Sequence, residues 1–132
     1  PELKELINIS KNKHYLMLEI KSNFSKKNLL QLIDLTKKLK FYSITSFNEN
    51  NIKNIYKLKK RIVLGLCLTS TSSVQKIIKK SKLKYINILV MEKKFLSKKE
   101  LNIINKPIYY YTARSKEIRN RYNNKNLIFE NL

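Results

Sequence analysis

Residues 15–47, YLMLEIKSNFSKKNLLQLIDLTKKLKFYSITSF, contain two strand-like runs with a helical segment between them. The runs YLMLEI (15–20) and YSITSF (42–47) are rich in the aliphatic, aromatic and β-branched residues that strands favour. Between the two runs, apolar residues recur at helical spacing, at Leu29, Leu30, Leu32, Ile33, Leu35 and Leu39. A crossover helix of this length predicts that the two strands are parallel neighbours.

The same alternation continues to the end of the chain. Further strand-like runs are RIVLGLCL (61–68), YINILVM (85–91), PIYYYT (107–112) and NLIFE (126–130). Apolar residues recur at helical spacing after residue 48, and again after TSTSS (69–73), whose hydroxyl groups can cap a helix N-terminus. The segment PELKELINI (1–9) predicts a further helix before the first strand. The pattern predicts the α/β class with a parallel sheet, and periodicity alone leaves an open sheet and a barrel both possible.

The composition is that of one globular domain spanning residues 1–132. Hydrophobic residues make up 42% of the chain, too many for a disordered one, and no apolar run reaches the roughly 20 residues of a membrane helix. The single cysteine, Cys67, lies in an apolar run and is expected to be a buried core thiol. One cysteine without a partner is consistent with a reducing compartment, so a cytoplasmic location is expected.

The chain is strongly basic, with 29 Lys and Arg against 9 Asp and Glu and a net charge of +20. Such a balance is typical of proteins that bind nucleic acid or anionic surfaces. The lysines are nevertheless spread over nearly every polar stretch, and the chain is also rich in Asn and Ile, as expected from an AT-rich coding bias. We favour a coding bias as the origin of the charge over selection for nucleic-acid binding, although the net charge leaves nucleic acid open as a partner.

Glu19 is the unusual residue of the first strand-like run. A carboxylate among leucine, methionine and isoleucine is costly to bury without a cation or hydrogen bonds to meet it. Lys21 lies two residues further on and therefore points to the same side of a strand. The pair is either a structural ion pair at a strand end or part of a site for a cation and an anion.

Several segments resemble, in order and spacing, the second part of the glycerophosphodiester phosphodiesterase family. They are PELKELI, YLMLEIK, ITSFN, the glycine within IVLGLCL, YYYTA and LIFEN. In that family a P-x-L-x-E helix precedes a strand ending E-I-K, the next strand ends S-F, and later strands carry W-T and a terminal I-T-D. The resemblance covers essentially the whole chain and rests on the ordered series, since each motif alone is weak.

The resemblance implies an incomplete TIM-type (β/α)8 barrel of about six βα units, equivalent to strands three to eight. Complete barrels need about 250 residues and place their chemistry at the carboxyl ends of the strands. The resemblance therefore implies that the family's first two strands, with both catalytic histidines and two carboxylate ligands, are missing from this chain. His14 matches neither histidine and is interpreted as a strand-entry or surface residue.

The resemblance also implies roles for particular residues. Glu19 matches the family's metal-binding glutamate, with Ca²⁺ or Mg²⁺ as the ion, and Lys21 is placed to bind a phosphate oxygen. Phe47 matches the phenylalanine of the family's S-F motif, and it either forms a wall of the site or packs in the barrel core. Tyr110 or Tyr111 stands where the family's W-T motif has tryptophan. Glu130 and Phe129 depart from the terminal pattern and are interpreted as structural.

The activity that the resemblance implies for a longer parent protein is metal-dependent hydrolysis of glycerophosphodiesters, giving glycerol 3-phosphate and an alcohol. As a fragment of this phosphoric diester hydrolase, the chain is expected to be inactive alone. One alternative is a non-catalytic basic barrel remnant that binds RNA or an anionic surface. Another is a pseudoenzyme that binds a phosphate ester without cleaving it.

Overall fold

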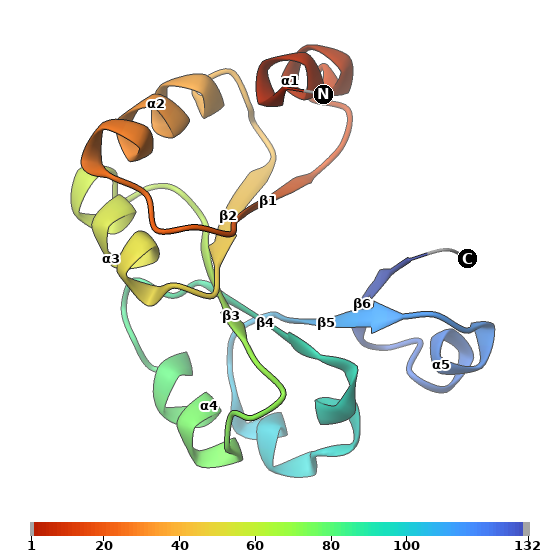
Figure 1. The fold of residues 1–132 in the computed structure, drawn as a ribbon. Coiled ribbons are helices and arrows are strands. Elements are labelled where there is room, and N and C mark those ends of the chain that lie inside the picture. The colour runs from red at the N-terminus through yellow and green to blue at the C-terminus, as the bar shows by residue number, and fades with distance from the viewer. Residues whose placement is uncertain (1, 131–132) are drawn as a thin grey trace.

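The computed structural model describes residues 2–130 as a curled parallel sheet with helices along its outer side (Figure 1). The strands are β1 (Leu16–Ile20), β2 (Tyr42–Ser46), β3 (Leu64–Leu68), β4 (Ile88–Glu92), β5 (Ile108–Ala113) and β6 (Asn126–Phe129). They follow one another across the sheet in chain order, and every neighbouring pair is parallel. The architecture is an incomplete (β/α) barrel of the TIM type, as predicted.

Each connection carries helical structure. The helices are α1 (Leu3–Ser10), α2 (Lys26–Thr36), α3 (Glu49–Leu58), α4 (Val74–Ser81) and α5 (Lys116–Arg121). Between β4 and β5, where the spacing predicted a helix, the chain forms two short 3₁₀ helices, η1 (Lys93–Ser97) and η2 (Lys99–Ile103). The predicted leading helix is α1, and Pro1 lies outside the described residues.

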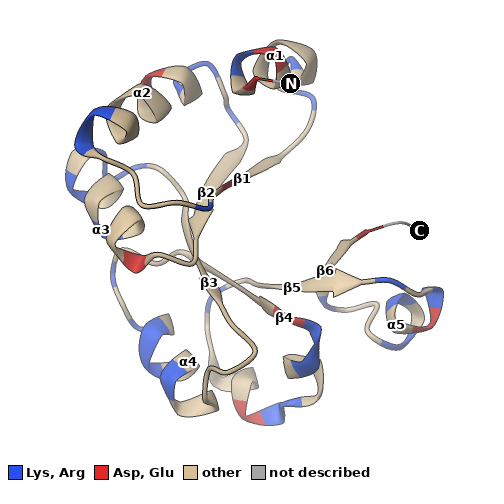
Figure 2. Ribbon diagram, viewed as in Figure 1, with Lys and Arg blue, Asp and Glu red and all other residues tan. Residues whose placement is uncertain are grey.

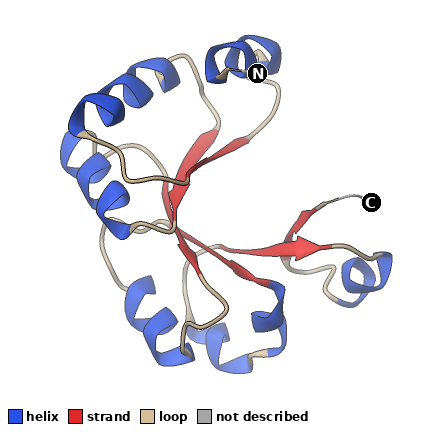
Figure 3. Cartoon of the chain, in the orientation of Figure 1, coloured by secondary structure: helices blue, strands red, loops and turns tan. Residues whose placement is uncertain are grey.

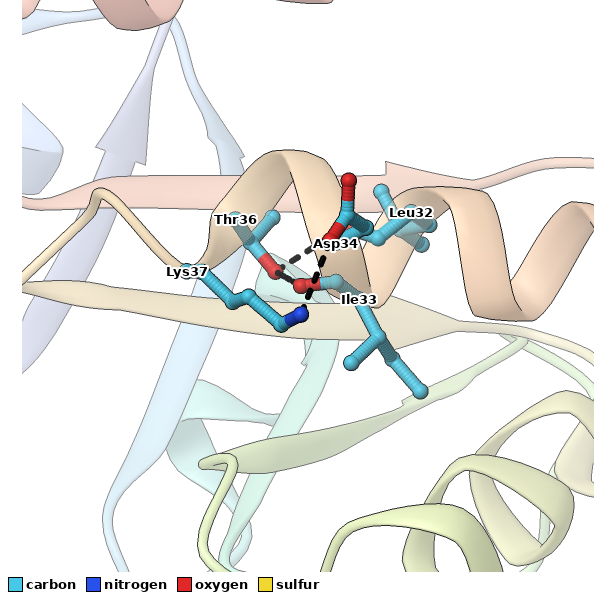
Figure 4. A network of polar contacts seen from close by, with 5 residues as sticks. All are labelled: Leu32, Ile33, Asp34, Thr36 and Lys37. Carbon is cyan, nitrogen blue, oxygen red and sulfur yellow. Dashed lines mark hydrogen bonds and ion pairs between the residues drawn. The ribbon is translucent and has the colours of Figure 1, made fainter.

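Polar side chains define where the helices begin and end. Ser25, Asn48, Ser73 and Ser115 each accept a hydrogen bond from a backbone N–H in the first turn of α2, α3, α4 and α5. Ser73 belongs to the predicted hydroxyl cluster. At the other end of α2, the Thr36 hydroxyl donates to the carbonyls of Leu32 and Ile33 (Figure 4). The four N-terminal caps satisfy backbone N–H groups that have no partner within a helix.

The hydrophobic core lies between the sheet and the helices. Ile44 and Leu64 of the sheet and Ile52, Ile55 and Ile77 of the helices are completely buried there. The other face of the sheet is concave and carries no helix (Figure 3). Strands β1 and β6 are the two edges of the described sheet, so the concave face is open along that side (Figure 3).

Gly65 shows how closely side chains pack on the concave face. A Cβ atom added there would lie 2.7 Å from Cγ1 of Ile88 and 2.8 Å from Cγ2 of Thr45. Both neighbours belong to adjacent strands and pair with Gly65 in register. A glycine therefore lets β2, β3 and β4 curl around this point, which orients their carboxyl ends toward a common mouth.

Candidate active site

The carboxyl ends of the parallel strands meet at one end of the concave face, which is where βα barrels hold their chemistry. An open cavity of about 720 Å³ occupies the face and reaches this mouth. Residues of β1, β2, β3, β4, β5 and β6, or directly adjoining them, line the cavity, namely Tyr15, Met17, Glu19, Lys21, Thr45, Phe47, Cys67, Val90, Tyr109, Tyr111, Thr112, Leu127, Ile128, Phe129 and Glu130.

Glu19 and Lys21 both line this cavity, near and just beyond the carboxyl end of β1. Both are exposed to solvent, so the carboxylate is not buried and does not need an internal partner. Within residues 2–130 the ion pairs join other residues, and none involves Glu19 or Lys21. The structural ion pair that the sequence left open is therefore not formed, and both charged groups face the cavity.

The loop that carries Lys21 is fastened to the next βα unit by a buried polar network. The Asn51 side chain accepts from the Phe24 N–H at 3.0 Å and donates to the Ser22 carbonyl at 2.8 Å. It also donates to Oγ of Ser46 at 3.2 Å, and that hydroxyl donates to the Ile20 carbonyl at 2.7 Å. Asn51 and Ser46 are completely buried. The network holds the backbone on both sides of Lys21 against β2 and α3.

Cys67 lies on the concave face below the mouth and is 5% exposed. Burial raises the pKa of its thiol to about 12, a hydrogen bond with Thr45 opposes the rise, and the charge of Glu19 adds to it. The thiol therefore stays protonated near neutral pH and is a poor metal ligand, because metals bind the thiolate. The predicted burial of the thiol is confirmed, although Cys67 lies on the concave face and not in the core between the sheet and the helices.

Phe47 and Tyr111 form an aromatic wall on the mouth. Their rings meet edge to face with centroids 6.3 Å apart, and the Tyr111 hydroxyl donates to the Leu68 carbonyl at 3.2 Å. Burial, followed by the nearby acidic groups of Cys67, Glu92 and Glu19, raises the pKa of Tyr111. Tyr110 is instead 3% exposed within the core on the helix side of the sheet. Of the two predicted tyrosines, only Tyr111 faces the cavity.

Two further carboxylates lie at strand ends around the mouth. Glu130 lines the cavity and forms an exposed ion pair with Arg114 at 3.0 Å, and the structural role expected for it stays a prediction. Phe129 also lines the cavity. Glu92, the last residue of β4, pairs in register with Tyr111 and was not singled out from the sequence. Its signal was a carboxylate directly after the apolar run 85–91, whereas Glu19 lies within an apolar run.

The residues described here do not make a complete metal site. No group of three or more His, Cys, Asp and Glu within residues 2–130 is placed to hold a metal ion. The exposed carboxylate of Glu19 has the hard oxygen donors that Ca²⁺ and Mg²⁺ prefer, so it fits as one ligand. His14 is exposed in the loop before β1 and does not line the cavity.

No protein-family model and no curated protein sequence matches the chain. Solved structures do match its fold. A phosphodiesterase from Oleispira antarctica, in complex with the product sn-glycerol-3-phosphate, has a TM-score of 0.77 and 16% identity over 98% of this chain and 56% of its own. A glycerophosphodiester phosphodiesterase from Parabacteroides distasonis has a TM-score of 0.72 and 14% identity, over 98% of this chain and 59% of its own.

A glycerophosphodiester phosphodiesterase from Agrobacterium tumefaciens gives a TM-score of 0.71 and 11% identity, over 98% of this chain and 56% of that one. The chain thus spans only a little more than half the length of these solved structures. Within the described residues, no helix is both long and apolar enough to cross a membrane. The chain has the fold of a part, somewhat over half, of the glycerophosphodiester phosphodiesterase barrel.

Proposed function

We propose that the protein containing this chain hydrolyses glycerophosphodiesters to glycerol 3-phosphate and an alcohol, using a divalent metal ion. The observation that carries the proposal is that Glu19, on β1, and Lys21, directly after it, both line the cavity of this barrel type. The fold neighbours, one of them with bound sn-glycerol-3-phosphate, support the substrate class.

In this proposal each charged group has a separate task. Glu19 provides one oxygen ligand to Ca²⁺ or Mg²⁺, and when bound the ion offsets the negative charge that develops on the phosphoryl oxygens. Lys21 contacts a phosphate oxygen as a point charge, with its loop held in place by Asn51. Phe47 and Tyr111 form the wall against the rest of the substrate, and Tyr110 supports β5 from the core.

We further propose that two βα units outside this chain complete the barrel. They would cover the edge strands β1 and β6, whose exposed backbone groups otherwise invite association. They would also bring the remaining metal ligands and the groups that move protons, because the described residues place no histidine at the mouth. The chain alone is then expected to show no turnover.

Binding of glycerol 3-phosphate to the complete protein tests the role of Lys21. In a titration followed by ³¹P NMR in the presence of Ca²⁺, Lys21→Gln should weaken binding by about tenfold or more, since a charge-assisted phosphate contact is lost. Lys27→Gln, an exposed lysine of α2 that lies outside the cavity lining, is the matched control. Equal affinities for the two variants would contradict the role proposed for Lys21.

A further inference from the structure

The positive charge is unevenly distributed between the two ends of the sheet. Six loops lead from helical segments into the strands, at the end of the sheet opposite to the mouth. They are residues 11–15, 37–41, 59–63, 82–87, 104–107 and 122–125. They hold twelve of the 29 lysines and arginines: Lys11, Lys13, Lys37, Lys38, Lys40, Lys59, Lys60, Arg61, Lys82, Lys84, Lys106 and Lys125. All six loops lie within the described residues, and none contains Asp or Glu. We call these loops the basic rim.

The loops at the mouth are different. The loops that leave β1, β2, β3 and β5, residues 21–25, 47–48, 69–73 and 114–115, contain only Lys21 and Arg114 as cations. The segment that leaves β4 is the exception, because η1 follows directly and carries Lys93 and Lys94. In Figure 2, Lys and Arg mark the chain after α1, α2 and α3, where it turns back toward the next strand. A coding bias toward lysine does not by itself explain this division, because both sets of loops are polar connections of the same barrel.

Helix dipoles explain only part of the rim. Lys11, Lys37, Lys59 and Lys82 are the C-caps of α1, α2, α3 and α4, where the negative end of the helix dipole favours a cation. Lys37 is also paired with Asp34 at 2.8 Å (Figure 4). The remaining rim cations lie further from the helix ends, so the dipole does not account for them. Their accumulation points to an anionic partner.

Side-chain hydrogen bonds join two pairs of neighbouring rim loops. The Asn12 side chain donates to the Lys38 carbonyl and accepts from the Lys40 N–H, both at 2.9 Å, which ties the first loop to the second. The Lys106 ammonium donates to the carbonyls of Leu83 and Ile86, which ties the fifth loop to the fourth. Nine of the rim cations are exposed, all except Lys59, Lys106 and Lys125.

Exposed apolar side chains occur on the same rim. Tyr15, Phe41 and Val63 are each the last residue of a rim loop and are 49%, 57% and 39% exposed. Ile9, in the last turn of α1 just before the first loop, is 75% exposed. Lysines interspersed with exposed aromatic and aliphatic side chains are the composition of surfaces that lie on anionic bilayers.

We propose that the basic rim docks on the surface of a bilayer containing anionic phospholipids, with the mouth facing away into solvent. A bilayer fits better than RNA for two reasons. Eleven of the twelve cations are lysines, which bind as point charges, whereas the forked contacts typical of nucleic-acid recognition need arginine. Ile9 and Val63 also suit the boundary between headgroups and acyl chains, and they cannot stack on bases as aromatic rings do.

The test compares two variants of equal net charge in vesicle co-sedimentation. The rim variant reverses four exposed rim cations: Lys13→Glu, Lys40→Glu, Arg61→Glu and Lys84→Glu. The control variant reverses four exposed lysines in the first turns of helical segments: Lys27→Glu, Lys76→Glu, Lys99→Glu and Lys116→Glu. Acidic residues are favourable in first helical turns, so the control is expected to fold, and circular dichroism verifies this for both variants.

With vesicles of phosphatidylcholine and phosphatidylglycerol at about 7:3, the rim variant should lose at least about tenfold in affinity and the control less than about threefold. Pure phosphatidylcholine vesicles should bind neither. Phe41→Ser should leave binding at low salt nearly unchanged and weaken it at high salt, where screening leaves the apolar contacts dominant. Each of these results supports the docking surface.

Equal losses for the rim and control variants would show that only net charge matters, and would overturn the proposal. Tighter binding to a single-stranded RNA than to vesicles of equal phosphate concentration, lost in the rim variant, would overturn it in favour of a nucleic-acid surface. Neither result bears on hydrolysis, because no residue that lines the cavity is changed. The docking surface and the proposed activity can therefore fail separately.

Discussion

The ring of Phe47, directly after β2, contacts the ring of Tyr111 on β5, with 6.3 Å between their centroids. Three strand spacings separate β2 from β5, which would place them about 14 Å apart in a flat sheet. The contact between the two rings therefore shows that the sheet is strongly curled. Both residues line the cavity that Glu19 and Lys21 also line.

The first prediction concerns this aromatic pair. Phe47→Ala and Tyr111→Ala should couple in a double-mutant cycle, with an interaction of about 0.5–1.5 kcal/mol in the free energy of unfolding. Tyr111→Phe keeps the ring pair and should lose only about 1 kcal/mol, from the bond to the Leu68 carbonyl. Urea denaturation measures the free energy of unfolding of five proteins: the wild type, the two single alanine variants, the double alanine variant and Tyr111→Phe. Strictly additive alanine variants would show that the two rings do not interact.

The second prediction concerns the buried network beside Lys21. Asn51→Ala leaves the Phe24 N–H and the Ser22 carbonyl without their partner, and should lower the free energy of unfolding by about 2–4 kcal/mol. Asn54→Ala, at an exposed position of the same helix, should change it by less than about 0.5 kcal/mol. Comparable losses at both positions would indicate a general helix effect and contradict the network.

The third prediction concerns the reactivity of Cys67. Because its pKa is raised to about 12, only about one thiol in ten thousand is ionised at pH 8, and burial limits access further. The native protein should react with a disulfide reagent at least about a thousandfold more slowly than the urea-unfolded protein. The rate should also rise about tenfold per pH unit while the fold persists. Fast labelling of native protein at pH 8 would contradict this environment.

The fourth prediction concerns acid stability. Partial burial raises the pKa of Glu49, but hydrogen bonds from Lys80 and Tyr85 outweigh it and leave the pKa lowered. A folded-state pKa below the unfolded value means that this stabilisation is present above the usual carboxyl range and is lost as the pH falls through it. Glu49→Gln should reduce the acid-side slope of stability against pH. Glu117→Gln, at an exposed position, is the matched control for the loss of one carboxylate.

The sequence predicted the six parallel strands and the shared face of Glu19 and Lys21, because strand alternation and crossover length are local properties. It could not choose between Tyr110 and Tyr111, since three consecutive tyrosines give the same pattern in either register. Asn51 was also missed. Asparagines at 50, 51 and 54 look alike in the sequence, and only the packing of α3 against the loop after β1 buries the second one.

The most direct test of the central claim is turnover by the complete protein that contains this chain. Conversion of a glycerophosphodiester to glycerol 3-phosphate can be followed by ³¹P NMR, with added Ca²⁺ or Mg²⁺ and with a chelator. The account predicts metal-dependent hydrolysis that falls by about 100-fold or more in Glu19→Ala. The carboxylate of Glu130 is paired with Arg114, so the variant Glu130→Ala should largely retain activity. Unchanged turnover in a folded Glu19→Ala protein, or full activity with the chelator, would contradict the proposed role of Glu19.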